Sequence, residues 1–217
     1  TIVEATSGNT GLGLAIAAAA KGYRCICTLP DKMSIEKIRV LRAYGVEVII
    51  TPTAVPHESP ESYHEVAKRI VRETPNSILA NQFFNPKNPE AHYKTTGPEI
   101  WEQTKGKVDC FVASQGTCGT LTGVGKFLRE RSPGTRLYAV EPAECPLLAH
   151  RRWGSHGIEG IGDIFRTVEH VGFQAVTMVR DGKGDFGGGA TEGLANDSLR
   201  LDRRAEQRGR HVGDGLS

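Results

Sequence analysis

The chain has 217 residues, of which 38% are hydrophobic and 24% are charged, and its formal net charge is +2. These totals are typical of a globular protein with one large domain or two small ones. The small net charge gives no sign of a polyanionic partner, so we expect no nucleic-acid binding. No apolar run is long enough for a membrane span, and none resembles a signal peptide, so we expect no membrane partner and a cytoplasmic location.

Short apolar segments alternate along the chain with segments of helical pattern. In chain order, the predicted elements are strand 1–4, helix 10–21, strand 23–29, helix 34–44, strand 47–51, helix 59–73, strand 78–79, a loop that feeds a helix within 81–101, strand 108–113, helix 121–131 and strand 136–140. The alanine-rich segment 10–21 is predicted to be a buried helix, and Ser59 is predicted to start the helix that ends at Glu73.

The repeated strand–helix order predicts an α/β fold with parallel sheets and helices on both faces, because the sequence shows no hairpin signals. In such folds, ligands bind beyond the carboxyl ends of the strands. Two segments connect a predicted strand end to a helix. We call residues 6–11 the first loop and residues 114–120 the second loop, and both are candidate sites.

The second loop has the composition of an anion site. Gly116 and Gly119 let backbone N–H groups approach an anion, the helix start adds partial positive charge, and Thr117 and Thr120 add hydroxyl donors. A phosphate monoester would suit this loop. A nucleoside triphosphate would not, because no Lys-Ser or Lys-Thr pair follows the glycines. The alternative is a tight turn whose small residues serve only packing.

The first loop carries Asn9 between its glycines. Ser7, Thr10 and the local amides could hold a carboxylate at the helix start, and Asn9 can both donate and accept hydrogen bonds. This segment predicts a carboxylate site rather than a second phosphate site.

A dinucleotide fingerprint is the rival interpretation of the first loop. It would begin at Gly11 and Gly13, with Asp31 as the ribose ligand. The fingerprint requires Gly or Ala at position 16, where this chain has Ile16. A bulky residue there disfavours close helix–strand packing, so the dinucleotide interpretation is disfavoured.

The five cysteines are Cys25, Cys27, Cys110, Cys118 and Cys145, and none forms a C-x-x-C pair. Cys25 and Cys27 lie two residues apart on a predicted strand, so they share one face. We interpret the cysteines as reduced thiols, in preference to metal ligands or disulfides. The histidines show no metal-ligand spacing.

Several separated motifs resemble those of the cystathionine β-synthase and cysteine synthase family. They are EATSGNTG, GYRC, HYKTTGPEIW, VASQGTCGTLTG and IEGIG, in the family's order and spacing. The resemblance covers residues 1 to about 165. It implies a pyridoxal-phosphate enzyme of the tryptophan-synthase-β fold type. It further implies two subdomains, incomplete at both ends: a smaller one that clasps substrate over residues 1–85, and part of a larger cofactor domain over residues 86–170.

The resemblance also implies roles for individual residues. Those implied to bind the cofactor pyridoxal 5′-phosphate are Asn9, at the ring hydroxyl oxygen, and Gly116, Thr117, Cys118, Gly119 and Thr120, around the phosphate. Those implied to bind the amino-acid substrate are Thr6, Ser7, Thr10 and Gln82, at its α-carboxylate, and Gly160, beside the cofactor. His92 either faces the active site or has a structural role in its own segment.

The activity that the resemblance implies is β-replacement in cysteine or cystathionine biosynthesis. A serine-derived amino acid would lose its β-substituent to give an aminoacrylate, to which a thiol then adds. Homocysteine would make the chain cystathionine β-synthase-like, and sulfide would make it a cysteine synthase. A third alternative is a non-catalytic, truncated remnant that binds the cofactor. Full-length family members are expected to form homodimers.

Three features depart from the family pattern. The family's Schiff-base lysine lies upstream of SGNTG, in a segment that this chain does not contain, so we assign no catalytic residue and expect the chain alone to be inactive. Cys118 stands where the family has glycine, which costs about 1 kcal/mol if the backbone there needs a positive φ. Residues 171–217 stay unassigned, as a disordered or frameshifted tail from about Gly182.

Overall fold

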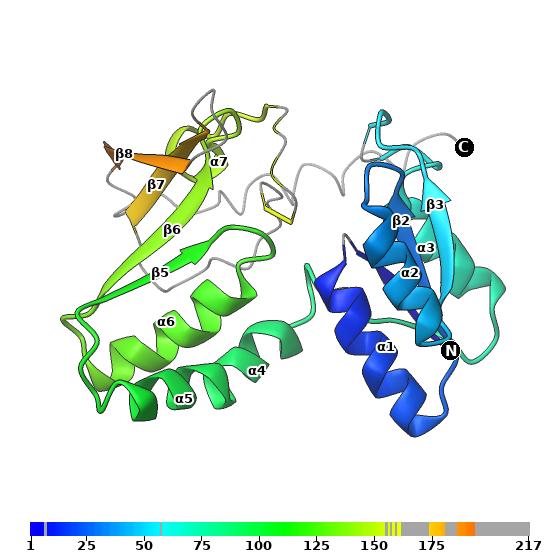
Figure 1. Ribbon diagram of the computed structural model, residues 1–217, viewed down its shortest axis with the longest axis horizontal. Coiled ribbons are helices and arrows are strands. Elements are labelled where there is room, and N and C mark those ends of the chain that lie inside the picture. The colour runs from blue at the N-terminus through cyan, green and yellow to red at the C-terminus, as the bar shows by residue number, and fades with distance from the viewer. Residues whose placement is uncertain are drawn as a thin grey trace, which may run out of the picture. The chain divides into compact units, whose positions relative to one another are not determined.

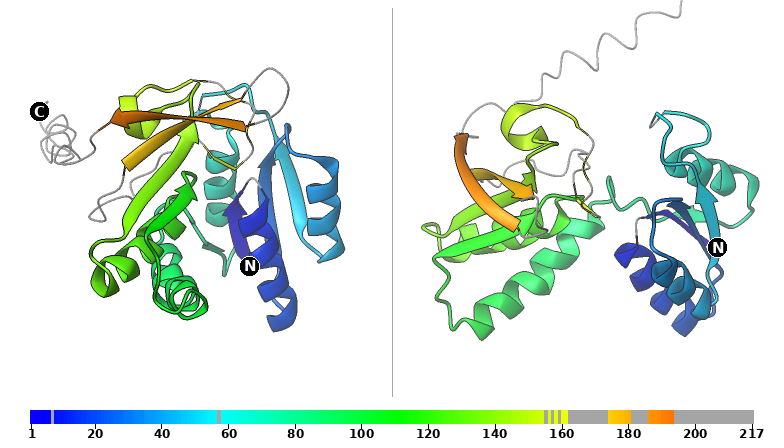
Figure 2. Two further views of the ribbon diagram at one scale, coloured as in Figure 1. Left: turned by 60° about the vertical axis from the view of Figure 1, so that its left-hand side comes forward. Right: turned by 45° about the horizontal axis from the view of Figure 1, so that its top comes forward.

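The computed structural model describes residues 1–6, 8–56, 58–154, 156, 158, 160–161, 174–180 and 186–193. The chain divides into two compact units, the first built on residues 1–88 and the second on residues 89–157, with the later segments divided between them. Figures 1 and 2 show the elements of each unit. In the described part of the chain, no helix combines the length and apolarity that a membrane crossing requires.

The first unit is a parallel four-stranded sheet with strand order β3-β2-β1-β4. Its elements are β1 (Ile2–Ala5), α1 (Asn9–Lys21), β2 (Cys25–Pro30), α2 (Ile35–Ala43), β3 (Glu47–Thr51), α3 (Tyr63–Glu73) and β4 (Ile78–Leu79). Val3 lies opposite both Ile26 and Leu79, so β1 is a central strand. The carboxyl ends of β1 and β4 therefore lie side by side.

Helices cover both faces of this sheet (Figure 1). The two faces follow from the alternation of side chains along β2, which is buried throughout. Cys25, Cys27 and Leu29 pack with residues of α1 and α2. Ile26 instead packs with Ala67 of α3. The expected shared face of Cys25 and Cys27 is confirmed.

The second unit has the strand order β5-β6-β7-β8. Its elements are α4 (Lys87–Lys94), which spans the boundary of the units, α5 (Thr96–Gln103), β5 (Cys110–Ser114), α6 (Gly119–Arg131), β6 (Arg136–Pro142), α7 (Leu147–His150), β7 (Gln174–Arg180) and β8 (Phe186–Gly193). The strands β5, β6 and β7 are parallel. Leu121 and Leu128 of α6 pack with Leu137 of β6 to form the core.

The predicted α/β class with parallel sheets is confirmed, and two strands, β7 and β8, are added to it. β8 pairs with β7 in the antiparallel sense, within the part of the chain that the sequence left unassigned. The sequence of β8, FGGGATEG, has neither alternation nor β-branched runs. Pairing with a neighbour, rather than local propensity, defines this strand. Residues 194–217, the greater part of the predicted disordered or frameshifted tail, lie outside the described residues.

Two helices differ from their predictions. α1 is not buried all round, because its buried residues are Gly11, Ala15 and Ala18, which form one stripe. α3 begins at Tyr63 rather than after Ser59, and Ser62 is its cap, accepting a hydrogen bond from the N–H of Glu65. The reason is that the N–H of Ser62 already donates to the Ser59 carbonyl at 2.9 Å in a turn of its own.

Candidate active site

The first loop follows the carboxyl end of β1 and starts α1. Thr6 is 1% exposed. Its Oγ1 accepts hydrogen bonds from the N–H groups of Gly8 at 3.0 Å and Gly11 at 3.2 Å. One buried hydroxyl therefore fixes the backbone on both sides of Asn9, which is exposed at the first position of α1. Ser7 lies outside the described residues.

Position 16 turns out not to be a packing position. Ile16 is 48% exposed on α1, so its bulk does not press on the sheet, and that argument against a dinucleotide site was wrong. Gly11 makes the close contact instead, since a Cβ there would lie 2.7 Å from Cγ2 of Thr6. Packing thus explains Gly11, whereas a Cβ on Gly13 would meet nothing within 4 Å.

Gln82 lies beside the first loop, as the sequence predicted for a shared site. The Thr10 hydroxyl donates to Oε1 of Gln82 at 2.6 Å. The Gln82 side chain in turn donates from Nε2 to the Ala5 carbonyl at 3.2 Å. The Gln82 side chain also hydrogen-bonds the carboxyl group of Glu4. The structure therefore brings together Thr6, Thr10 and Gln82, three of the five predicted substrate residues.

Gly160, a fourth predicted substrate residue, is described in a turn with a φ of 78°. A Cβ placed on Gly160 would meet no atom within 4 Å. Its role beside the cofactor therefore stays a prediction.

Sequence reasoning missed Glu4, the residue beneath Gln82. Its side chain is 1% exposed. The carboxylate accepts hydrogen bonds from the N–H groups of Asn81 at 2.6 Å and Gln82 at 3.2 Å. Burial raises the pKa of Glu4 to about 7, although the two amide bonds act in the opposite direction. An acidic residue inside an otherwise apolar strand was the signal available in the sequence.

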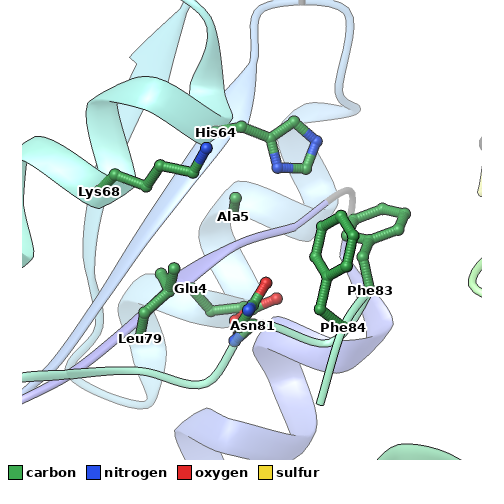
Figure 3. A pocket seen from close by; sticks show the side chains of 8 residues that line it. All are labelled: Glu4, Ala5, His64, Lys68, Leu79, Asn81, Phe83 and Phe84. Carbon is green, nitrogen blue, oxygen red and sulfur yellow. Dashed lines mark hydrogen bonds between the residues drawn. The ribbon is translucent and has the colours of Figure 1, made fainter. Parts of the chain in front are cut away.

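A pocket adjoins Glu4 at the ends of β1 and β4 (Figure 3). Figure 3 shows the carboxyl group of Glu4 beside Asn81, with His64 and Lys68 contributed by α3. The remaining lining residues are Ala5, Leu79, Phe83 and Phe84. Phe83 packs edge-on against His64, with 5.1 Å between ring centroids.

The second loop joins β5 to α6. Cys118 precedes the helix with a φ of 59° and a ψ of 10°, the left-handed conformation. The N–H groups of the first helical turn have no partner within the helix, and the Gly119 N–H makes only a long contact of 3.4 Å to Oγ1 of Thr117. These amides, with Gly116 at the strand end, form a cradle whose composition fits a phosphate group.

A hydrogen-bonded chain from α4 supports the second loop. Nε2 of His92 lies 3.1 Å from Oγ1 of Thr120, and Nδ1 of His92 lies 3.0 Å from Oγ1 of Thr96. In a neutral His92 whose proton is on Nε2, the ring donates to the Thr120 oxygen and accepts from the Thr96 hydroxyl at Nδ1. The Thr120 hydroxyl proton can then be donated to an anion. Partial burial lowers the pKa of His92. His92 thus contacts the loop directly, and the structure gives it a supporting role.

Cys118 is not an activated thiol. It is 5% exposed. Burial, followed by the nearby charge of Glu141, raises its pKa to about 12. Glu141 is itself buried and accepts hydrogen bonds from the N–H groups of Leu148 and Ala149 at 2.6 and 2.8 Å. A thiolate role for Cys118 is excluded at neutral pH, and its side chain is a packing residue.

Comparison with known proteins gives a consistent result. The family described as "Pyridoxal-phosphate dependent enzyme" matches residues 1–186. Cystathionine beta-synthase of Oryctolagus cuniculus is 50% identical over 174 residues, which are 77% of this chain and 32% of that protein. Cystathionine beta-synthase of Apis mellifera is 48% identical, over 77% of this chain and 34% of that protein. The chain thus spans about a third of the length of these relatives.

Solved structures share the fold. A hydrogen sulfide-producing enzyme from Fusobacterium nucleatum matches with a TM-score of 0.77 and 38% identity, over 83% of this chain and 61% of that one. Cysteine synthase from Entamoeba histolytica matches with a TM-score of 0.65 and 43% identity, over 74% of this chain and 47% of that one. These identities are high enough to carry the family as well as the fold.

Proposed function

Because the chain belongs to the family of pyridoxal-phosphate dependent enzymes, which confirms the predicted cofactor, we propose that its two loops divide the binding task. The second loop holds the cofactor phosphate, and the first loop holds the carboxylate of an amino-acid substrate. The observation that carries this proposal is the cluster of Thr6, Thr10 and Gln82 at one helix start. Thr6 and Thr10 order the loop and the Gln82 amide there, and a neutral amide at the start of a helix suits a carboxylate.

Bound pyridoxal phosphate would supply an electron sink for chemistry at the substrate Cα and Cβ. This chain's own residues would bind and orient. The amides of the second loop and the Thr117 and Thr120 hydroxyls would hold the phosphate. Asn9, exposed at the start of α1, would hydrogen-bond the ring hydroxyl oxygen. The Gln82 side-chain amide, positioned by Thr10, would fix the carboxylate end of the substrate.

The proposed reaction is β-replacement on a serine-derived amino acid, in cysteine or cystathionine metabolism. The β-substituent and the Cα proton leave, a thiol adds at Cβ, and the proton returns to Cα. The cystathionine beta-synthase relatives, at up to 50% identity, favour homocysteine as the thiol. The cysteine synthase structure at 43% identity favours sulfide as the second candidate. Comparing the binding of homocysteine and of sulfide to the chain loaded with pyridoxal phosphate separates the two, because this comparison requires no turnover.

We also propose that none of the chain's lysines binds the cofactor covalently, so that this chain alone binds it without turnover. Borohydride reduction of the loaded chain, followed by mass spectrometry, should leave no cofactor mass on the protein. A modified lysine would contradict this proposal and would identify the residue.

The direct test of the binding proposal is titration of the full chain with pyridoxal phosphate, followed by visible absorbance and thermal unfolding. Thr120→Val should weaken binding, because it removes a proposed phosphate donor. Thr104→Val is the matched control: its hydroxyl donates to the Ile100 carbonyl at 2.8 Å, and it belongs to the end of α5. No absorbance change and no thermal stabilisation by the cofactor would refute the proposal.

A further inference from the structure

Gln82 reaches the first loop only because its backbone is held in an unusual turn. Asn81, just before it, has a φ of 55°, a left-handed conformation that a non-glycine residue adopts at some cost. The Asn88 side chain donates to the Gln82 carbonyl at 3.0 Å. The N–H groups of Asn81 and Gln82 both donate to Glu4. The N–H groups of Phe84 and Asn85 also close the turn onto the Asn81 carbonyl, at 3.0 and 2.9 Å. The buried carboxylate of Glu4 is the acceptor that holds the two N–H groups of the turn itself.

We propose that Glu4 is a positioning residue, whose ionised carboxylate holds the Asn81–Gln82 turn and thereby sets the affinity of the first loop for a carboxylate ligand. This inference rests on the proposed function of the first loop. Glu4 does not touch the ligand in it. Glu4 acts through the backbone of Gln82, whose side chain meets Thr10 at 2.6 Å.

The ionised form of Glu4 satisfies both amides better than the protonated form. A carboxylate offers acceptors on both oxygens, whereas a protonated carboxyl turns one oxygen into a donor. The contacts to Asn81 and Gln82 involve different oxygens, Oε2 and Oε1 respectively. Protonation therefore replaces one of the two hydrogen bonds by a donor–donor contact and loosens the turn.

The loss falls within the ordinary pH range, because the pKa of Glu4 is about 7. About a tenth of the molecules carry an ionised Glu4 at pH 6 and about nine tenths at pH 8. If only that fraction binds well, the affinity for a carboxylate ligand rises by up to about tenfold between these two pH values. Other ionisable groups near Glu4 are His64 and Lys68 from α3 and Cys25 and Cys27 from β2.

Those neighbours supply the controls. Lys68 is ion-paired with Glu65 at 2.6 Å. The hydrogen bond with Cys25, together with burial, raises the pKa of Cys27 above its usual range. His64 titrates nearest to pH 7 in the unperturbed state, so it is the main competing source of a pH profile. His64→Gln should leave the profile in place, whereas Glu4→Gln should remove it.

The experiment is a pH titration of the full chain by nuclear magnetic resonance, without cofactor. The backbone amide signals of Asn81 and Gln82 should titrate together with a midpoint near pH 7. Glu73→Gln, which alters an exposed carboxylate at the end of α3, should behave as the unaltered chain. In Glu4→Gln, the titration should disappear. If that variant does not fold, the unaltered chain and His64→Gln still decide the matter.

The second measurement is calorimetric binding of L-serine to the chain saturated with pyridoxal phosphate, at pH 6 and pH 8. We expect about tenfold tighter binding at pH 8 and no pH dependence in Glu4→Gln. Equal affinity at both pH values, or a profile that survives Glu4→Gln, would overturn the inference while leaving the proposed function intact. Absence of serine binding at any pH, with amide signals that still follow Glu4, would instead refute the proposed function and support the coupling.

Discussion

The first and second loops both connect a strand to a helix, but different residues form the two connections. Each leads from a parallel strand into a helix of 13 residues, and each helix is preceded by a residue with positive φ and no side-chain cap. In the first loop that residue is Gly8, with a φ of 140°. In the second it is Cys118, with a φ of 59°. A side chain disfavours this left-handed conformation.

The supports of the loops differ as well. A buried hydroxyl on Thr6 and a buried carboxylate on Glu4 fix the first loop and its Gln82 neighbour. The neutral side chain of His92 supports the second loop through the hydroxyls of Thr96 and Thr120. A loop proposed for a carboxylate thus relies on an ionisable anchor, while a loop proposed for a phosphate relies on neutral ones. The first loop should therefore respond more strongly to pH.

The largest expected effect concerns the helix contact behind the second loop. A Cβ on Gly123 would lie 2.3 Å from the Pro89 carbonyl oxygen, a backbone atom that cannot move aside. We expect Gly123→Ala to lower the free energy of unfolding by about 3 kcal/mol or more. Gly11→Ala should cost less, because its close neighbour is the Thr6 methyl group.

Gly13→Ala is the matched control, since a Cβ there meets nothing within 4 Å. It should raise the free energy of unfolding by about 0.5–1 kcal/mol, as the helix propensities require. Urea unfolding of the three variants measures the series. A stabilising Gly123→Ala would show that α4 and α6 do not approach as closely as described.

The next effect is the pH dependence of stability that Glu4 contributes. Its folded-state pKa of about 7 lies above the ordinary value of 4.5, so between these values the folded state binds a proton that the unfolded state has lost. Stability therefore falls as pH rises from about 4.5 to about 7, by up to roughly 3 kcal/mol. Urea unfolding at pH 5 and pH 8 measures the difference in unfolding free energy between the two pH values. This difference should be smaller in Glu4→Gln than in the unaltered chain, and an equal difference would contradict the prediction.

Thr6→Val tests the neutral support of the first loop. Valine has nearly the same shape but no acceptor, so the N–H groups of Gly8 and Gly11 lose their shared partner. We expect a cost of about 1–3 kcal/mol in unfolding free energy. Thr53→Val, at an exposed hydroxyl that bonds Asp31, should change stability far less. Equal costs for the two variants would mean that Thr6 does not organise the loop.

The smallest effect should be at Cys118. Cys118→Gly and Cys118→Ala both remove the thiol, but only glycine relieves the left-handed backbone. Glycine should therefore be the more stable variant by about 1 kcal/mol, against the usual helix order. Thermal unfolding of the pair checks the sign. A more stable Cys118→Ala would indicate that the backbone there is not left-handed.

The sequence by itself determined the class of the fold. Short apolar runs such as CICTLP and EVIIT indicated strands, and the helical patterns between them indicated parallel pairing. The first of these strands is buried throughout, whereas the second is partly exposed. The glycines and hydroxyls at strand ends also marked both loops and Thr10 as candidate sites, whereas Thr6 and Gln82 were named through the family resemblance. Local composition was sufficient wherever the structure depends on residues close in sequence.

Tertiary structure decided what depends on residues far apart. Glu4 and Gln82 are 78 residues apart in the chain, and Thr120 and His92 are 28 apart, so no local pattern could join them. The left-handed backbone at Cys118 and the pairing of the glycine-rich β8 likewise arise from their surroundings. Burial sets the ionisation of Glu4, and burial is a property of the assembled fold rather than of any segment of the sequence.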